Sequence, residues 1–468
     1  MLTTSRVAAL VILFAAATGA HQPFAASNVP NPTVIGPIPA SVAPGDPSHD
    51  YPFFSTSADL ASQGYVEEEY FFEGTANRYA ISPLATAVVL DGGHPYRTRM
   101  IVRRPTSADR FNGTVLMEWQ NNAQNYDIDG LWTFGHAHIL RRGYAWVGVS
   151  AFRAGVHAPA VGLKAWSPSR YRTLDVTGGG AIADDALSFD IFSHAGQLVK
   201  YPVGTDPMGG LPVERVFAFG ASQAASKGLV PYHNAIHPLA GVFDGFLPVI
   251  GGVNAALRTD LDVNVLKVWT ESEAANSTFD GRQPDSDRLR RWEVAGAAHF
   301  GWQFVQAVRP LQQRDLNVSP VFSCDLPPFS RVPFTHVVNA ALDAMVAWVA
   351  SGTQPPHAPE VEIVAFGSPN VIARDNFGNA LGGIRLPEHA VATATNTGLN
   401  GPATNFCRTF GSHEPFDQAT LDALYRNHGT YVSQVAQSAE RNLQDGFLVR
   451  EDAMATIQEA SQSVVGKQ

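Results

Sequence analysis

The stretch that decides the fold is Val216-Phe-Ala-Phe-Gly-Ala-Ser-Gln-Ala-Ala225. A short apolar segment leads into Gly220-Ala-Ser-Gln-Ala224, and an alanine-rich segment with helical spacing follows it. A serine on a sharp turn between a buried strand and a helix is typical of a nucleophile exposed at the edge of a sheet. Small residues two positions before and after it let the strand and the helix pass close together. The pattern predicts an α/β fold with Ser222 as nucleophile, although a serine that caps a helix would give the same five residues.

Strand-like and helix-like segments alternate on both sides of this stretch. The predicted strands are short, apolar and bounded by turn residues: 114–119, 144–150, 215–219, 245–250, 265–269 and 292–295. The predicted helices between them are 132–142, 185–200 and 224–237. This alternation indicates a mostly parallel central sheet covered by helices. Residues 50–113 are expected to add antiparallel strands at the N-terminal side.

A nucleophilic serine needs a general base, which in such a fold follows it in the chain after an acidic residue. The segment Trp292-Glu-Val-Ala-Gly-Ala-Ala-His299 has the pattern of a strand, a turn of small residues and a histidine. His299 is therefore the predicted base. The competing histidines lie on predicted helices or among prolines, and none follows a strand: His233, His237, His336 and His357.

The orienting acid should follow the strand before that one. Thr270-Glu-Ser-Glu273 supplies two carboxylates at this place. A strand that ends at Thr270 favours Glu273, whereas one that ends at Val268 favours Glu271. We favour Glu273 and keep Glu271 as the alternative; the carboxylate that is not the acid is expected to be solvated or to support the site from behind.

Two backbone N–H groups are expected to form an oxyanion hole. The N–H of Gln223 lies at the start of the helix after Ser222, where a developing negative charge is stabilised. The second donor should come from the loop after strand 114–119, from the N–H of Gln120, Asn121 or Asn122. The amide side chains of this loop are candidates for lining the acyl pocket.

The composition excludes several classes of protein. The chain has 468 residues, 45% of them hydrophobic, and a net charge of −10 without any run of Lys or Arg. Nucleic acid is therefore not an expected partner, because phosphate binding needs a concentrated basic surface. No phosphate-binding loop and no dinucleotide motif is present, and His136-Ala-His138 falls in a predicted helix, where the two rings diverge. We expect neither a cofactor nor a metal.

The first residues have the features of a processing signal. Arg6 precedes the apolar run 7–17, and Thr18-Gly-Ala20 offers small residues for cleavage. Such a run is too short to cross a bilayer comfortably. We expect residues 1–20 to be a signal peptide, with an uncleaved anchor as the alternative, and the protein to be secreted or periplasmic. No later segment is long and apolar enough for a stable membrane span.

We expect one catalytic domain with additions at both ends. Its parts are an N-terminal arm (21–50), the catalytic core (51–310) and a C-terminal helical lid and packing region (311–468) that belongs to the same domain. Helices are expected at 335–351 and over 416–463, the latter in three pieces broken at Gly429 and Gly446. Cys324 and Cys407 are either a disulfide, as an oxidising compartment would favour, or two separate thiols.

Taken together, these motifs resemble the bacterial alpha/beta hydrolase domain proteins, a group of exported or cytoplasmic proteins regarded as esterases. The matching stretches cover nearly the whole mature chain: Leu116–Asn121, Gly143–Ser150, Tyr171–Leu174, Phe189–Phe192, Gly220–Gln223, Thr270–Glu273, Gln283–Asp287, Trp292–His299, Gly382–Pro387 and Leu424–Asp452. Ala224 departs from the family, in which a second serine is common at that position. The resemblance implies the α/β-hydrolase fold, a triad of serine, acid and histidine, and hydrolase activity, but not a substrate.

The residues and the resemblance together predict a serine esterase that cleaves a small-molecule carboxylic ester through an acyl-enzyme. An acyltransferase with the same triad is one alternative. A secreted binding protein on an inactive hydrolase scaffold is another. The sequence leaves the oligomeric state open.

Overall fold

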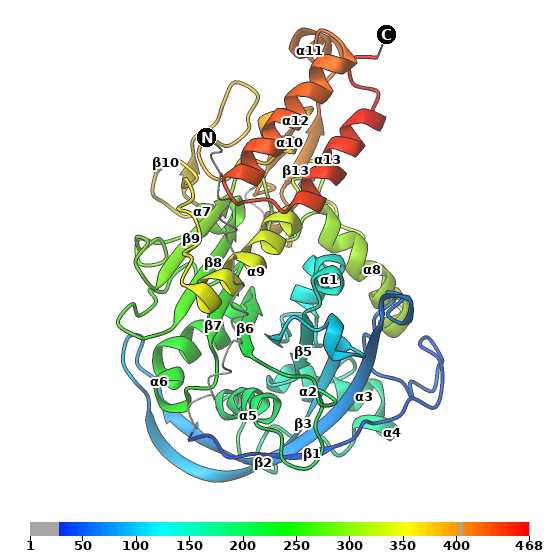
Figure 1. The fold of residues 1–468 in the computed structure, drawn as a ribbon, viewed down its shortest axis with the longest axis vertical. Coiled ribbons are helices and arrows are strands. Elements are labelled where there is room, and N and C mark those ends of the chain that lie inside the picture. Colours follow the sequence, from blue (N-terminus) through cyan, green and yellow to red (C-terminus); the bar gives the residue numbers. More distant parts are fainter. Residues whose placement is uncertain (1–27, 402–405, 468) are drawn as a thin grey trace, which may run out of the picture.

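The computed structural model describes residues 28–401 and 406–467, so the predicted signal peptide lies outside the described residues. Its centre is a nine-stranded sheet in the order β1-β2-β3-β5-β4-β6-β7-β8-β9 (Figure 1). The strands are β1 Thr33–Ile35, β2 Tyr65–Ala80, β3 Val88–Pro105, β4 Thr114–Trp119, β5 Ala145–Val149, β6 Arg215–Ala221, β7 Gly245–Val249, β8 Asn264–Thr270 and β9 Leu289–Val294. Strands β4 to β9 are parallel, and β1 to β3 are antiparallel to their neighbours. The predicted parallel sheet with an N-terminal antiparallel addition is confirmed.

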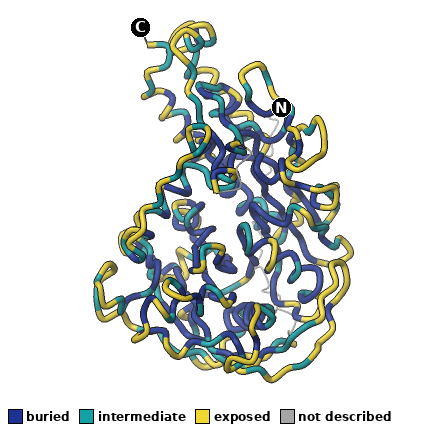
Figure 2. Tube along the Cα trace, turned by 180° about the vertical axis from the view of Figure 1, so that it is seen from behind, coloured by how far each residue is buried: buried dark blue, intermediate teal, exposed yellow. Residues whose placement is uncertain are grey.

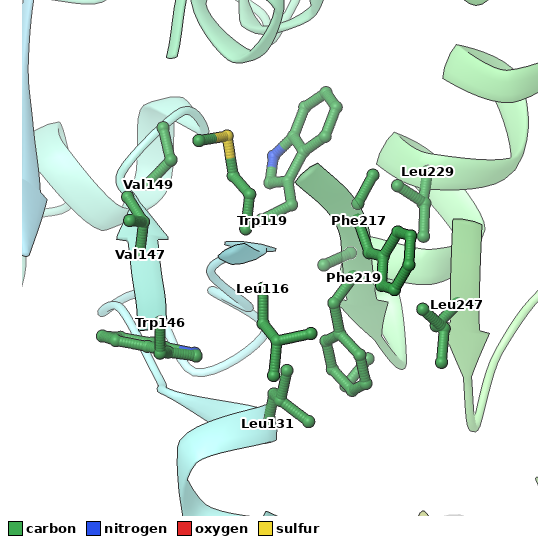
Figure 3. Packing of buried hydrophobic residues seen from close by; sticks show 14 of the residues in the cluster. Leu116, Trp119, Leu131, Trp146, Val147, Val149, Phe217, Phe219, Leu229 and Leu247 are labelled. Carbon is green, nitrogen blue, oxygen red and sulfur yellow. The ribbon is translucent and has the colours of Figure 1, made fainter. Parts of the chain in front are cut away.

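Helices cover both faces of this sheet. Helices α1 (Gly130–Arg142) and α9 (Phe334–Ser351) pack against each other on one face, while α5 (Ser188–Lys200) lies on the other. Figure 3 shows the division at β4, where Leu116 points toward Leu131 of α1 and Trp119 lies on the opposite side. The Trp119 ring stacks on Phe192 of α5 at 4.5 Å. Alternate residues of one strand thus bury both faces, as a central parallel strand requires.

The helix after Ser222 is present but partly of π type. It comprises Ala224–Leu229, Tyr232–Ile236 and α6 (His237–Ala240). Tyr232 and Ile236 are buried against the sheet. The buried segments are concentrated around the sheet, and exposed ones lie at the loops and the outer helices (Figure 2).

Helix α9 has the length and apolarity of a membrane span, and it is the one such helix in the described part of the chain. It packs on α1 and β8, and half of it is buried inside the protein. Gly352 ends it in the left-handed conformation, with φ of 71°, as is common for a helix C-terminus. Its apolar face therefore serves the core.

The C-terminal region ends in three helices, as predicted. They are α11 (Gln418–Leu424), α12 (His428–Gln444) and α13 (Arg450–Gln462), and α12 and α13 pack against each other away from the sheet (Figure 1). The first break differs from the prediction at Gly429. The chain breaks at 425–427 because the Asn427 side chain caps α12 by accepting from the Thr430 N–H.

The other longer helix is α8 (Trp302–Leu316). The short elements are α2 Arg153–His157, α3 Leu163–Trp166, α4 Pro168–Tyr171, α7 Glu271–Asn276, α10 Pro387–Ala390, three 3-10 turns (Ala61–Gln63, Ala108–Arg110 and Phe406–Thr409) and the ribbons β10 Ile363–Ala365 with β11 Val371–Ile372 and β12 Ala394–Thr397 with β13 Ser412–Pro415. One predicted boundary falls inside a helix, and the other separates two strands that pair with each other. Strand β1 belongs to the expected arm, yet it pairs with β2. Helix α8 crosses position 310, so the core continues into the C-terminal region without a break.

Candidate active site

Ser222 sits on the turn between β6 and the following helix in a strained conformation. Its φ is +58°, in the left-handed region that residues other than glycine rarely adopt. The turn is held from both sides: the Ser222 N–H donates to the Val249 carbonyl at 2.9 Å, and the Ser226 N–H donates to the Ser222 carbonyl at 2.9 Å. Strain at a serine that neighbouring strands hold in place is the signature of a nucleophile turn.

The close approach of strand and helix explains the small residues around Ser222. A Cβ at Gly220 would lie 3.1 Å from the Ala224 backbone. A Cβ at Gly251, two residues beyond the end of the neighbouring strand β7, would lie 2.5 Å from the Ser222 carbonyl oxygen. A larger side chain at either position would displace the turn. The expectation that smallness is required at 220 is confirmed.

His299 and Glu273 continue a hydrogen-bonded series from the serine. The Ser222 Oγ lies 2.8 Å from His299 Nε2, and His299 Nδ1 lies 2.6 Å from Glu273 Oε1. The side chains of His299 and Glu273 are only 13% and 5% exposed, so the series is largely shielded from water. Three residues from three strand ends, of which Ser222 and His299 are 77 positions apart in the chain, thus meet at one edge of the sheet.

The choice between the two glutamates depends on where β8 ends. It ends at Thr270, and α7 begins with Glu271. Thr270 caps that helix, and the second carboxylate oxygen of Glu273 accepts from the Thr270 N–H at 3.1 Å and from its hydroxyl. Thr270-x-x-Glu273 is a capping-box pattern, a signal in the sequence that would have located the strand end.

Glu271 has different partners and is not solvated, contrary to one expectation for the second carboxylate. It is fully buried, pairs with Arg374 at 2.8 Å, and accepts from the Gly296 N–H at 2.9 Å. Gly296 begins the turn that carries His299, so Glu271 holds that turn from behind. Ser272, which the sequence analysis did not single out, accepts from the His299 N–H at 3.0 Å.

Gln120 and Asn121 were expected as possible backbone donors to the oxyanion hole, and the structure corrects this for both. The Gln120 N–H donates to Val149 at 3.2 Å, and the Asn121 N–H donates to Ile128 at 3.3 Å. Both donors are consumed because the loop continues the sheet and then forms a bridge with residue 128. Their side chains are also engaged, that of Gln120 with Asp129 and that of Asn121 with the Ala221 carbonyl.

Asn122 and Gln223 remain as the donors beside Ser222. In the described chain the Gln223 N–H has no acceptor, and the Asn122 N–H meets only the Gln223 Oε1, at 3.3 Å. The Asn122 side chain is buried, and its amide atoms have no hydrogen-bond partner among the described residues. The acceptor of the Asn122 N–H is a side chain that can rotate, unlike the backbone carbonyl that holds the Asn121 N–H, so the loop presents one releasable backbone donor and one unpaired amide next to the nucleophile turn.

A buried polar network supports this loop. Arg103 pairs with Asp129, which accepts from Gln120, and Ser150 joins Gln120 to Asp127. Burial raises the pKa of Asp127 to about 6. Burial, with Asp129 nearby, also raises the pKa of Glu118 to about 8. The hydrogen bonds of Gln120 with Asp129 and Ser150 hold the loop in place on its buried side.

A comparison with known families matches residues 34–458 to the alpha/beta hydrolase domain. The chain belongs to the alpha/beta hydrolase domain family. No curated protein matches it.

Solved structures similar to this alpha/beta hydrolase domain protein are distant. An α/β serine hydrolase without a lid from Xanthomonas campestris is 13% identical, with 53% of this chain and 97% of that one covered at a TM-score of 0.28. The acetyl xylan esterase from Paenibacillus sp. R4 is 11% identical, with 43% and 55% covered at a TM-score of 0.22. The rice cell wall degrading esterase LipA from Xanthomonas oryzae is 13% identical, with 42% and 46% covered at 0.22. Likenesses at these TM-scores carry no argument about activity.

Two of the competing histidines of this hydrolase domain, His233 and His357, have hydrogen-bond partners elsewhere, whereas the buried Nδ1 atoms of His237 and His336 have none among the described residues. His233 bonds Asn234, His357 bonds Asp285, and burial lowers the pKa of His237 to about 3. His136 and His138 bond the Trp132 carbonyl and Asp343 separately. Over residues 28–401 and 406–467, no group of three or more His, Cys, Asp or Glu side chains is placed to hold a metal ion.

The two cysteines form a disulfide between Cys324 and Cys407, which settles the choice that the sequence left open. Phe322 lies two residues before Cys324, and Phe406 directly precedes Cys407. The bridge thus ties together two C-terminal loops that carry aromatic side chains. Phe329 and Phe410 pack beside it in one apolar cluster.

Proposed function

We propose that this protein is a serine esterase that cleaves a carboxylic ester through an acyl-enzyme, with Ser222 as nucleophile, His299 as base and Glu273 as orienting acid. The observation that carries the proposal is the pair of hydrogen bonds, 2.8 Å and 2.6 Å long, that joins the three side chains behind a strained serine. A serine that merely capped a helix would need neither the base nor the acid.

The chemistry follows from these contacts. Ser222 Oγ attacks the ester carbonyl carbon while its proton passes to His299 Nε2. Glu273 accepts a hydrogen bond from Nδ1–H, which fixes the tautomer and stabilises the imidazolium. The Gln223 and Asn122 N–H groups stabilise the oxyanion.

Collapse of the tetrahedral intermediate expels the alcohol, which takes the proton from Nε2. A water molecule then gives its proton to Nε2 and attacks the acyl-enzyme. The acid leaves, Ser222 regains its proton, and no cofactor enters either half of the reaction.

Two further features belong to the proposal. A disulfide between Cys324 and Cys407 supports an exported protein, because such bonds persist in oxidising compartments. The C-terminal region is proposed to act as a lid through its loops near 322 and 410, since these lie by Phe300, the neighbour of His299. Helices α12 and α13 would then support the lid from outside.

The first experiment is labelling with a fluorophosphonate probe, which reacts with activated serines. Labelling at Ser222 that is lost in Ser222→Ala and strongly slowed in His299→Asn is the expected result. Absence of labelling in the folded wild type would favour the inactive-scaffold alternative. Product analysis with added alcohol separates the esterase from an acyltransferase, which would transfer the acyl group instead of releasing the acid.

A further inference from the structure

A cavity of about 380 Å³ lies beside the candidate site. Two of its lining residues directly follow site residues: Phe300 follows His299, and Ala123 follows Asn122. The Phe300 ring stands edge-on to the His299 imidazole, with the centroids 4.6 Å apart. The cavity therefore begins between the base and the oxyanion loop, where one side of a bound ester must lie.

Phenylalanine rings are the most frequent side chains in the walls of the cavity, beside smaller apolar residues and the amides of Gln124, Asn125 and Gln312. Phe322 and Phe410 meet at 4.5 Å between centroids, and Phe300 and Phe304 at 5.2 Å. Phe304 and Phe410 are buried, and Val305 and Val308 complete the apolar side that α8 contributes. A planar ring in this space would extend the existing tilted and edge-to-face contacts, which an aliphatic chain would not.

Arg309 is the one charged residue among the described residues that line the cavity. Within the described ranges it has no ion pair, and its hydrogen bond is a long one, 3.4 Å, from Nη2 to the Pro320 carbonyl. Its guanidinium lies 5.5 Å from the Phe329 ring. A guanidinium carries five N–H donors in a planar fork that suits a carboxylate, so most of this capacity is left for a ligand.

Helix α8 sets the distance between Arg309 and the reacting atoms. The helix begins at Trp302, three residues after His299, and Arg309 lies two turns further on. At 1.5 Å per residue, Arg309 lies roughly 10 Å along the helix axis from Trp302, the end of the helix that follows His299. Val305 and Val308 lie on the same face between them, so the wall that α8 gives this path is apolar up to the guanidinium.

We propose that this cavity binds an aromatic part of the substrate that bears a carboxylate, which pairs with Arg309. The proposal rests on the esterase function above and adds the substrate class: an ester with an aryl group on one side and an anionic substituent at its far end. A para-carboxycinnamoyl group has the required order of ester, ring and charge.

The test compares isosteric substrates that differ in charge. Methyl 4-carboxycinnamate is paired with methyl 4-carbamoylcinnamate for the acyl side, and 4-carboxyphenyl acetate with 4-carbamoylphenyl acetate for the alcohol side. The ratio of kcat/KM within each pair is measured for the wild type, for Arg309→Gln and for the control Arg331→Gln. Arg331 stacks on Trp302 and lines a different cavity.

In one of the two pairs, Arg309→Gln is expected to lower the ratio of charged to neutral substrate by roughly tenfold or more, mainly through KM. The neutral substrates and the control variant should be unaffected. A ratio that Arg309→Gln leaves unchanged in both pairs would overturn the proposal, provided that Ser222 still reacts with the fluorophosphonate and p-nitrophenyl acetate is cleaved. If the wild type neither reacts with the fluorophosphonate nor cleaves p-nitrophenyl acetate, the esterase function itself is wrong.

Discussion

The carboxyl edge of the sheet and the aromatic cavity beside it border the same serine, yet they are assembled differently. The edge takes Ser222, Glu273 and His299 from the ends of three parallel strands, where topology alone brings them together. The cavity takes its walls from residues between 123 and 410, most of them on α8 and on loops tied by a disulfide. Changes at the edge should therefore act on the chemical step, and changes at the cavity on binding.

The largest expected effect is at the nucleophile. Ser222→Ala should lower kcat for p-nitrophenyl acetate by about 10⁴-fold or more, because no other group can form the acyl-enzyme. The thermal unfolding midpoint should not fall, since alanine keeps the turn and removes a hydroxyl. Residual activity within tenfold of the wild type would show that Ser222 is not the nucleophile and that the edge of the sheet is not the catalytic site.

The two glutamates of α7 provide a matched pair at the edge. Glu273→Gln should lower kcat by about 10²- to 10⁴-fold, because the imidazole loses the partner that fixes its tautomer. Glu271→Gln should lower kcat less than about tenfold but destabilise the fold, because Arg374 loses its partner. Steady-state kinetics and urea unfolding on both variants separate the two roles. Equal losses of kcat would show that the edge has no single acid.

Removal of the disulfide tests the cavity. In the double variant Cys324→Ala/Cys407→Ala the two aromatic loops are no longer joined. The loss of a cross-link across 83 positions should lower the free energy of unfolding by about 4–5 kcal/mol on the chain-entropy model. KM for aryl esters should rise several-fold, while the rate of fluorophosphonate labelling stays near that of the wild type. Slower labelling with an unchanged KM would contradict the proposal that the cavity acts on binding and the edge on the chemical step.

The smallest effect on activity is expected at Lys267, inside β8 beneath the edge. Its ammonium donates to three backbone carbonyls, those of Gly252, Ala255 and Gly281. Burial, with the nearby charge of Arg291, lowers the pKa of Lys267 to about 7 from an ordinary 10.5. The unfolded chain therefore binds one more proton than the folded one between these pH values, so Lys267 makes stability rise with pH there.

Lys267→Met should remove that rise. The stability of the variant relative to the wild type is expected to decline by a few kcal/mol between pH 7 and pH 10. Denaturant unfolding at several pH values measures it, with kcat at pH 7 as the control for the site. A relative stability that is independent of pH would mean that the lysine remains charged in the folded protein.

The sequence alone determined the central strands, the helices that flank Ser222, and the chain positions of Ser222 and His299. Short apolar runs fixed the strands, and the Gly-x-Ser-x-Ala turn placed Ser222 where the structure has it. His299 could be placed because the carboxyl ends of parallel strands meet at one edge, whatever the lengths of the connections between them. These are local patterns combined with a general rule of topology.

Only the tertiary structure decided what depends on contacts between distant segments. The hydrogen bond of Glu273 to His299 and the pairing of Glu271 with Arg374 separated the two glutamates. The bridge between Asn121 and Ile128 consumed one expected oxyanion donor and left Asn122 in its place. A hydrogen-bonding group has the same chemistry in any sequence, but whether it is free depends on which partners the fold brings within about 3 Å. The aromatic cavity has the same origin, since none of its walls is recognisable until α8 and the disulfide-linked loops lie side by side.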